Sequence, residues 1–467
     1  MTASAAVRRA CSGALVGAVL GAGALTGLPS GGELQAVVAY QGTVPHRAGT
    51  SVVGVLPVLH MAVVRGHAAD LAALAADPSV RGLQLDSAAH VTSAKDDRGT
   101  TGVLASAGLG GNAGQPGAGA GVRVALVDTG VSDTPALNRA SGRLVDGVDA
   151  STPGTLATGG TYTDGYGHGT FMATVIAGGP VQGTNGAALG VAPGATVVNV
   201  RVANQDGSTS LSRVLGGLEW IAEHPSQVDV ANLALSYDAP QKKYGADPLT
   251  DAVDKVRKAG VTVVVASGND HKSLGDPGFD PLALTAGAID ATTGKVASFS
   301  GSDSVYGYEK PDVVASGVDV LGLLPTGSVI EKQPSTRHLA NGLFRGSGTS
   351  QATAVTSGLA ALLLAAHPGA TPAQVKASLR CAATNLPGHR DGAGSVSATT
   401  TLCAGPDGQK LDGSGDGTGE GSFDANAWAA NAWAANAWAA NAWAANAWAA
   451  NAWAANAWAA DGWGTSP

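Results

Sequence analysis

The stretch "FRGSGTSQATAVTSGLAALLLAAHP" (residues 344–368) joins a turn of glycine, serine and threonine to a long apolar segment of small residues. Serine and threonine commonly cap helices, so this stretch predicts a buried helix that begins near Ser350. The same residues also suit a catalytic serine at a helix start, where free N–H groups stabilise negative charge. The local pattern fits both interpretations, and the rest of the chain has to distinguish them.

The composition of the 467 residues allows one large domain with accessory segments. The formal net charge is −8, and no cluster of Lys and Arg is long enough for a phosphate-binding surface. Nucleic acid is therefore not an expected partner.

The N-terminus has the layout of a secretory signal peptide. Arg8 and Arg9 precede an apolar run from Ala14 to Leu28, which is short and broken by glycine for a membrane span. An apolar helix or a membrane anchor is the alternative. We expect a signal peptide over residues 1–39, with a small-residue cleavage candidate at Ala39, and no membrane span after its removal.

Three further segments flank the main domain. Residues 40–95 predict a strand, a helix and a second strand, a unit too small to be stable without packing on something larger. Residues 404–424 form a polar linker of Gly and Asp. In residues 425–467 the unit "NAWAA" occurs seven times, and its period of five gives neither a helix stripe nor a single strand face. We expect a disordered tail, or a tryptophan array that associates with a cell wall or matrix.

The region from about residue 120 to 382 alternates continuous apolar strands with helices. The strands "VRVALVDTG", "ATVVNVRVA", "VDVANLALS" and "VTVVVASGN" predict an α/β fold whose parallel sheet is covered on both faces. Chemistry gathers at the carboxyl ends of such strands. Asp128 and Asn269 lie at two of these ends, and His168 lies between two glycines before a helix.

These residue types suit acyl transfer to a serine. A neutral imidazole can take the hydroxyl proton, and a carboxamide can donate to a developing oxyanion. Each residue also has an ordinary explanation: Asp128 and Asn269 as turn formers, and His168 as a core or capping residue. Together with Ser350, and in the order Asp, His, Asn and Ser along the chain, they favour the catalytic interpretation.

The chain resembles the subtilisin-like serine proteases, most closely the secreted bacterial alkaline-protease-like type. The matching motifs are "VALVDTG", "GHGTFMATVIAG", "GVAPGATVV", "VVVASGND", "KPDVVASGV" and "GSGTSQATA". The resemblance implies a three-layer fold with a mostly parallel central sheet, with the catalytic domain over residues 96–403. It also implies that residues 40–95 are an inhibitory propeptide, and that the protein is a secreted endopeptidase made as a zymogen.

The resemblance also assigns roles to the site residues. Ser350 would be the nucleophile, His168 the general base and Asp128 the residue that orients His168. Asn269 and the Ser350 N–H would form the oxyanion hole. Substrates would be proteins or peptides, held between two walls: Ala234, Leu235 and Ser236 on one side, and Ala266, Ser267 and Gly268 on the other.

Several positions depart from the family pattern. Ala234 and Ser236 stand where the family has Ser and Gly, Ser267 replaces Ala, Ser316 replaces Pro, and Gln351 replaces Met. A side chain at Ser236 is expected to narrow the specificity pocket. None of these changes removes a catalytic group. They leave a second hypothesis, a catalytically weak or silent relative that acts as a surface binding or scaffold protein through its tail.

Two cysteines, Cys381 and Cys403, remain after the signal peptide. An even pair in an exported chain suggests a disulfide, although two free thiols are the alternative. No cofactor is required by the proposed chemistry, and no metal site is predicted. Calcium stabilises many family members, and the loop "NDHKSLGDPGFD" (269–280) is a weak candidate because it lacks dense ligand spacing.

Overall fold

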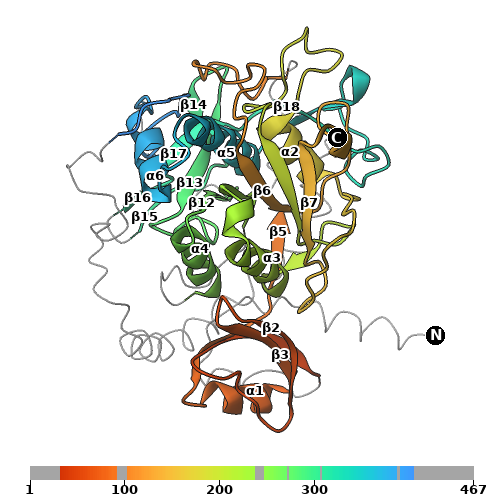
Figure 1. Cartoon of the computed structure of the whole chain (residues 1–467), viewed down its shortest axis with the longest axis vertical. Coiled ribbons are helices and arrows are strands. Elements are labelled where there is room, and N and C mark those ends of the chain that lie inside the picture. Colours follow the sequence, from red (N-terminus) through yellow and green to blue (C-terminus); the bar gives the residue numbers. More distant parts are fainter. Residues whose placement is uncertain are drawn as a thin grey trace.

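The computed structural model describes residues 32–91, 102–236, 247–270, 273–305, 308–386 and 390–403. A small β-rich unit lies at the bottom of the view in Figure 1, below a larger α/β domain. The predicted signal peptide up to residue 31, the linker and the tail lie outside the described residues.

An eight-stranded sheet forms the centre of the large domain. Its order is β14-β13-β12-β10-β6-β8-β7, with β17 beside β13, and every pairing is parallel except that of the edge strand β14. The strands are buried along most of their length, as continuous apolar runs predict. The predicted α/β fold with a mostly parallel sheet is therefore confirmed. Its strands are β6 (Arg123–Asp128), β7 (Leu144–Asp149), β8 (Thr196–Arg201), β10 (Val230–Leu233), β12 (Thr262–Ala266), β13 (Leu284–Asp290), β14 (Lys295–Val296) and β17 (Val313–Ser316).

Helices cover both faces of this sheet (Figure 1). On one side α3 (Leu211–Glu223) packs beside α4 (Pro248–Lys258). On the other, α2 (His168–Ala177) packs against α5 (Thr349–Ala366), which α6 (Pro372–Cys381) also contacts. Among the described helices, α5 alone has the length and composition to cross a membrane, but 89% of it is buried inside the protein. It is a core helix, buried on nearly every side.

Shorter elements surround these layers. Two hairpins lie outside the main sheet, and a three-stranded sheet has the order β11-β5-β9. Short 3₁₀ turns occur at residues 139–141, 225–227 and 340–342. The strands are β5 (Ala88–Val91), β9 (Thr209–Ser210), β11 (Leu235–Ser236), β15 (Asp303–Val305), β16 (Tyr308–Lys310), β18 (Val320–Leu323) and β19 (Leu343–Gly346).

The small unit is a four-stranded antiparallel sheet of order β2-β3-β1-β4, with one helix packed on it. Its core contains Leu71 and Leu74 of the helix, which are fully buried. The apolar pattern predicts only two strands here, because the end of β2, the turn after it and β3 form one largely apolar run. The elements are β1 (Leu34–Tyr40), β2 (Thr50–Leu56), β3 (Met61–Gly66), α1 (Ala68–Ala75) and β4 (Val80–Leu85).

The predicted domain boundary after Ala39 is wrong. It falls inside β1, which pairs with β3 on one side and β4 on the other. Cleavage there would remove an inner strand and expose both neighbours, so the small unit begins no later than Leu34.

Candidate active site

Asp128 and His168 meet where β6 ends and α2 begins. His168 Nδ1 lies 2.8 Å from Oδ1 and 2.9 Å from Oδ2 of Asp128. Both side chains are buried, with exposed fractions of 1% and 0%. A carboxylate that accepts from Nδ1–H selects the tautomer in which Nε2 carries the lone pair. The arrangement therefore presents His168 as a base.

Ser350 is the second residue of α5. Its hydroxyl donates to the Ala234 carbonyl oxygen over 2.9 Å. The helix start places backbone N–H groups beside this oxygen, and the positive end of the helix favours negative charge there. The same stretch is thus both a helix start and the position of a candidate nucleophile.

Asn269 follows β12 and is oriented by the residue before Ser350. Its Oδ1 accepts from the N–H of Thr349 over 2.9 Å and from the Thr349 hydroxyl over 3.0 Å. These bonds fix the amide so that Nδ2 is a buried donor, and Nδ2 has no partner within the described part of the chain. A buried, fixed and unused donor suits a charge that appears only during a reaction.

Asp164 is a site residue that the sequence did not reveal. Its carboxylate accepts from the N–H groups of Tyr166, Gly167 and Thr170 over 2.7–3.1 Å. It also accepts from the Thr129 hydroxyl over 2.8 Å. Burial raises the pKa of Asp164, although these hydrogen bonds act in the opposite direction. Asp164 therefore holds the first turn of α2, which carries His168.

Thr129 completes the connection between the strand and the helix. Its N–H donates to Asp128 Oδ1 over 2.7 Å, and its hydroxyl accepts from the Gly169 N–H over 2.9 Å. Gly169 is thus tied directly to the residue after Asp128, and Gly167 is tied to it through Asp164. The relative position of Asp128 and His168 depends on this connection.

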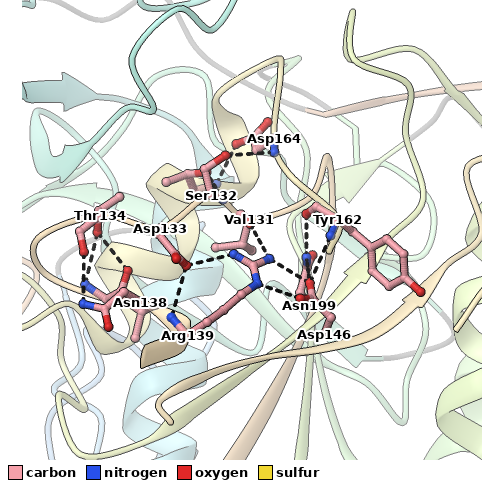
Figure 2. A network of polar contacts seen from close by, with 12 residues as sticks. Val131, Ser132, Asp133, Thr134, Asn138, Arg139, Asp146, Tyr162, Asp164 and Asn199 are labelled. Carbon is pink, nitrogen blue, oxygen red and sulfur yellow. Dashed lines mark hydrogen bonds and ion pairs between the residues drawn. The ribbon is translucent and has the colours of Figure 1, made fainter. Parts of the chain in front are cut away.

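A second polar network holds the loop after β6 (Figure 2). Arg139 donates to both oxygens of Asp146, over 2.6 and 2.8 Å, and to Asp133 over 2.8 Å. Asp146 also accepts from Asn199 Nδ2 over 2.7 Å and from the Tyr162 N–H over 3.3 Å. Burial tends to raise the pKa of Asp146, but the hydrogen bonds from Arg139 and Asn199 outweigh it, so the pKa is lowered. This network supports the segment that leads to Asp164.

One of the two predicted substrate walls, at β11, pairs with β5, a strand that follows the small unit in the chain. β5 lies between β9 and β11 and pairs antiparallel with both, with Val91 opposite Leu235 and His90 opposite Ser236. Ala234, Leu235, Ala266, Ser267 and Gly268 are all buried. The chain's own residues 90–91 thus lie extended along β11, and residues 88–89 along β9.

Two carboxylates fasten the small unit to α3. Asp86 accepts from the N–H of Ser212 over 2.8 Å and from its hydroxyl over 2.6 Å, at the start of α3. Near the other end, the buried Glu219 accepts from the N–H groups of Val58 and Leu59 over 2.8 and 2.9 Å. Burial raises the pKa of Glu219. The unit is therefore held at both ends of one helix.

Cys381 and Cys403 form a disulfide, which joins the end of α6 to a segment 22 residues further on. Calcium binding by the loop 269–280 stays a prediction. Asp270 accepts from the Ser273 hydroxyl, and Asp280 accepts from the N–H groups of Leu282 and Ala283. The described residues contain no group of three or more His, Cys, Asp or Glu side chains placed to hold a metal.

Comparison with known proteins identifies the class. The subtilase family model matches residues 119–398, so the chain belongs to the subtilase family of subtilisin-like serine proteases, as the sequence motifs predicted. Serine protease AprX of Bacillus subtilis (strain 168) is 35% identical over 283 residues, which are 57% of this chain and 62% of AprX. Subtilisin DY of Bacillus licheniformis is 32% identical over 274 residues, 57% of this chain and 85% of that protein. The extracellular serine proteinase of Thermus sp. (strain Rt41A) is 35% identical over 263 residues, 56% of this chain and 55% of that protein.

Proposed function

We propose that this protein is a serine endopeptidase that hydrolyses peptide bonds in proteins or peptides through an acyl-enzyme. The observation that carries the proposal is the buried Asp128–His168 pair at the carboxyl end of β6. Membership of the subtilase family supports the same reaction.

In the proposed mechanism, Ser350 Oγ attacks the substrate carbonyl carbon while His168 Nε2 takes the hydroxyl proton. Asp128 stabilises the imidazolium that forms. The oxyanion accepts from Asn269 Nδ2 and from the Ser350 N–H. His168 then passes its proton to the leaving amine, and a water activated by the same imidazole releases the acyl group.

We further propose that the enzyme is made as a zymogen and secreted. The small unit, described from residue 32, would be the propeptide, and β5 would block the cleft as an uncleaved or newly cleaved segment. Asp86 and Glu219 support this role, because each binds across the contact between the unit and α3. The signal-like N-terminus and the extracellular Thermus relative support an extracellular location.

A fluorophosphonate probe tests the activity directly. The processed protein should be labelled, and Ser350→Ala should abolish labelling. Asn269→Ala should keep labelling at a lower rate, because loss of one oxyanion donor costs about 10²–10³ in kcat. A processed wild type without labelling would refute the enzyme and favour the silent scaffold protein.

The tail carries a separate proposal, attachment to a cell wall or matrix through its tryptophan repeats. Retention on cell-wall material should fall when the chain ends at Asp424. Equal retention of the full chain and the shortened chain would contradict attachment.

A further inference from the structure

The loop between β18 and β19, residues 324–342, leads to the candidate nucleophile. Its first part, residues 325–333, is closed by its own backbone. The Ser328 N–H donates to the Pro325 carbonyl over 3.1 Å, and the Lys332 N–H donates to the Ser328 carbonyl over 3.1 Å. Its second part continues into β19, and α5 with Ser350 follows shortly after that strand. The loop therefore runs from a compact turn toward the nucleophile.

The first part of this loop binds the residues just before His168. The Val329 N–H donates to the Gly165 carbonyl over 2.9 Å, and the Ile330 N–H donates to the Tyr166 carbonyl over 3.0 Å. Both carbonyls precede α2, which begins at His168. Two consecutive hydrogen bonds thus hold the loop against the turn that carries the base.

Gly167 lies against the same part of the loop. A Cβ built on Gly167 would stand 2.9 Å from Ser328 Oγ and 3.4 Å from Ile330 Cβ. The Ile330 side chain is 1% exposed, so the contact is closely packed and the turn has no room to move toward the loop. Asp164 holds the N–H groups of this turn, and the loop holds its carbonyls.

The second part of the loop is attached to β19. The Leu339 N–H donates to the Leu343 carbonyl over 2.8 Å, and the Arg345 N–H donates to the Arg337 carbonyl over 3.1 Å. These bonds fix the strand that leads to Ser350. One loop therefore binds the turn before the base and the strand before the nucleophile.

His338 joins the two parts of the loop. Its Nε2 lies 3.1 Å from the carbonyl oxygen of Gln333, where the first part ends. A carbonyl only accepts, so Nε2 carries the hydrogen of this bond. The His338 ring packs edge-on against Phe344 of β19, with ring centroids 5.0 Å apart. Phe344 packs in the same way, over 6.2 Å, against Phe171 of the helix that carries His168.

We propose that the β18–β19 loop is a positioning element that sets the distance between His168 and Ser350, and that His338 is the positioning residue that joins its two parts. The inference rests on the proposed endopeptidase function. Proton transfer from Ser350 Oγ to His168 Nε2 requires the two atoms to be within hydrogen-bond reach. A loop that opens at His338 frees the turn before α2 from the strand before α5. Proton transfer then slows, whereas substrate binding is unchanged.

Peptide hydrolysis by the processed protein tests this role. His338→Ala should lower kcat about 10–100-fold and leave KM within about twofold of wild type, because a misplacement of about 1 Å can cost about 10²-fold in rate. His338→Gln places a side-chain N–H donor near the position of Nε2, so it should recover most of the lost kcat. A loss of kcat that glutamine does not recover, or a change confined to KM or Tm, would overturn the proposal.

His224→Ala is the matched control. His224 Nδ1 donates to the Trp220 carbonyl over 2.8 Å, and its ring stacks on that of Trp220 with centroids 4.6 Å apart, at the end of α3. The variant loses the same kinds of contact outside the loop, so kcat should stay within about twofold of wild type. An equal loss of kcat in His224→Ala and His338→Ala would contradict a specific role for the loop.

Amide exchange needs no catalysis, so it separates failure of this inference from failure of the proposed function. In full-length Ser350→Ala, His338→Ala should speed exchange of the Val329 and Ile330 N–H groups about tenfold or more, since exchange reports local opening. His338→Gln and His224→Ala should leave this exchange unchanged. Unchanged exchange in His338→Ala would overturn the role of the loop even in a chain without activity.

Discussion

Asp164→Asn should slow catalysis although the residue does not touch the substrate. Three donors share Oδ1, and the Thr170 N–H reaches Oδ2, over 2.8 Å. An asparagine can keep its oxygen at only one of these positions. If the amide oxygen stays with the three donors, its NH₂ group faces the Thr170 N–H, and two donors oppose each other.

The size of the effect follows from these bonds. A buried donor left without its acceptor costs about 1–3 kcal/mol. The first turn of α2 can relieve this cost only by moving, and it carries His168. A displacement of about 1 Å at a catalytic group can cost about 10²-fold in rate. We therefore expect kcat to fall about 10–100-fold, with KM little changed.

Asp146→Asn is the matched control. Asp146 also accepts several hydrogen bonds and its side chain is 11% exposed, but its partners are Arg139, Asn199 and Tyr162 rather than α2 (Figure 2). It should lower Tm and leave kcat within about threefold of wild type, since its loss does not move His168 directly. Peptide hydrolysis, its pH profile and calorimetry measure these outcomes. The reasoning is refuted if both variants lose the same kcat, or if Asp164→Asn lowers only Tm.

Three further predictions concern stability, each measured by urea unfolding in a Ser350→Ala background that prevents self-digestion. Replacing Cys381 and Cys403 by serine should cost about 3 kcal/mol, because the disulfide closes a 22-residue loop; no loss would contradict this. Asp312→Asn should cost about 3–5 kcal/mol at pH 7, since it breaks a buried cluster in which Asp312 binds Lys310, Lys376 and Arg380. Burial tends to raise the pKa of Asp312, but the three cations outweigh it, so the pKa is lowered. The stabilisation of the fold by ionised Asp312 is therefore complete above about pH 4 and is lost progressively in acid. An equal loss of unfolding free energy in Asp312→Asn at pH 7 and pH 3 would contradict this. Gln351→Met should raise stability by about 1–3 kcal/mol, because both polar atoms of this buried amide lack a partner among the described residues; an unchanged or lower midpoint would speak against it.

The central sheet was predictable because each of its strands is recognisable from its own apolar residues. A strand covered on both faces is a nearly continuous apolar run, and β12 (Thr262–Ala266) is buried throughout. Helices with small residues follow the same logic, since α2 and α5 are buried nearly all round. Patterns that depend only on local burial are visible in one sequence.

The small unit was harder to predict for a physical reason. β1 (Leu34–Tyr40) is a short run of small apolar residues, and it follows another such run at the N-terminus. Composition does not separate an export signal from an inner strand, so the predicted boundary after Ala39 falls between the sixth and seventh residues of the strand. The pairing of β1 with β3 and β4 depends on residues up to about 50 positions away, which no local window contains.

The candidate catalytic residues could be singled out one by one in the sequence, but their arrangement could not. Asp164 makes some hydrogen bonds that a local stretch of sequence predicts and one that only the fold brings about. Its bonds to Gly167 and Thr170 span three and six residues, so an Asp just before a helix start was a readable capping signal. Its bond to Thr129 spans 35 residues and exists only because β6 ends beside α2. The bonds from Gly167 and Thr170 to Asp164 predict only a helix start, as the sequence around Ser350 does. The connection from Asp164 through Thr129 to Asp128 exists only in the folded sheet. A residue type at a helix start therefore becomes evidence for function when a partner from a distant strand end meets it.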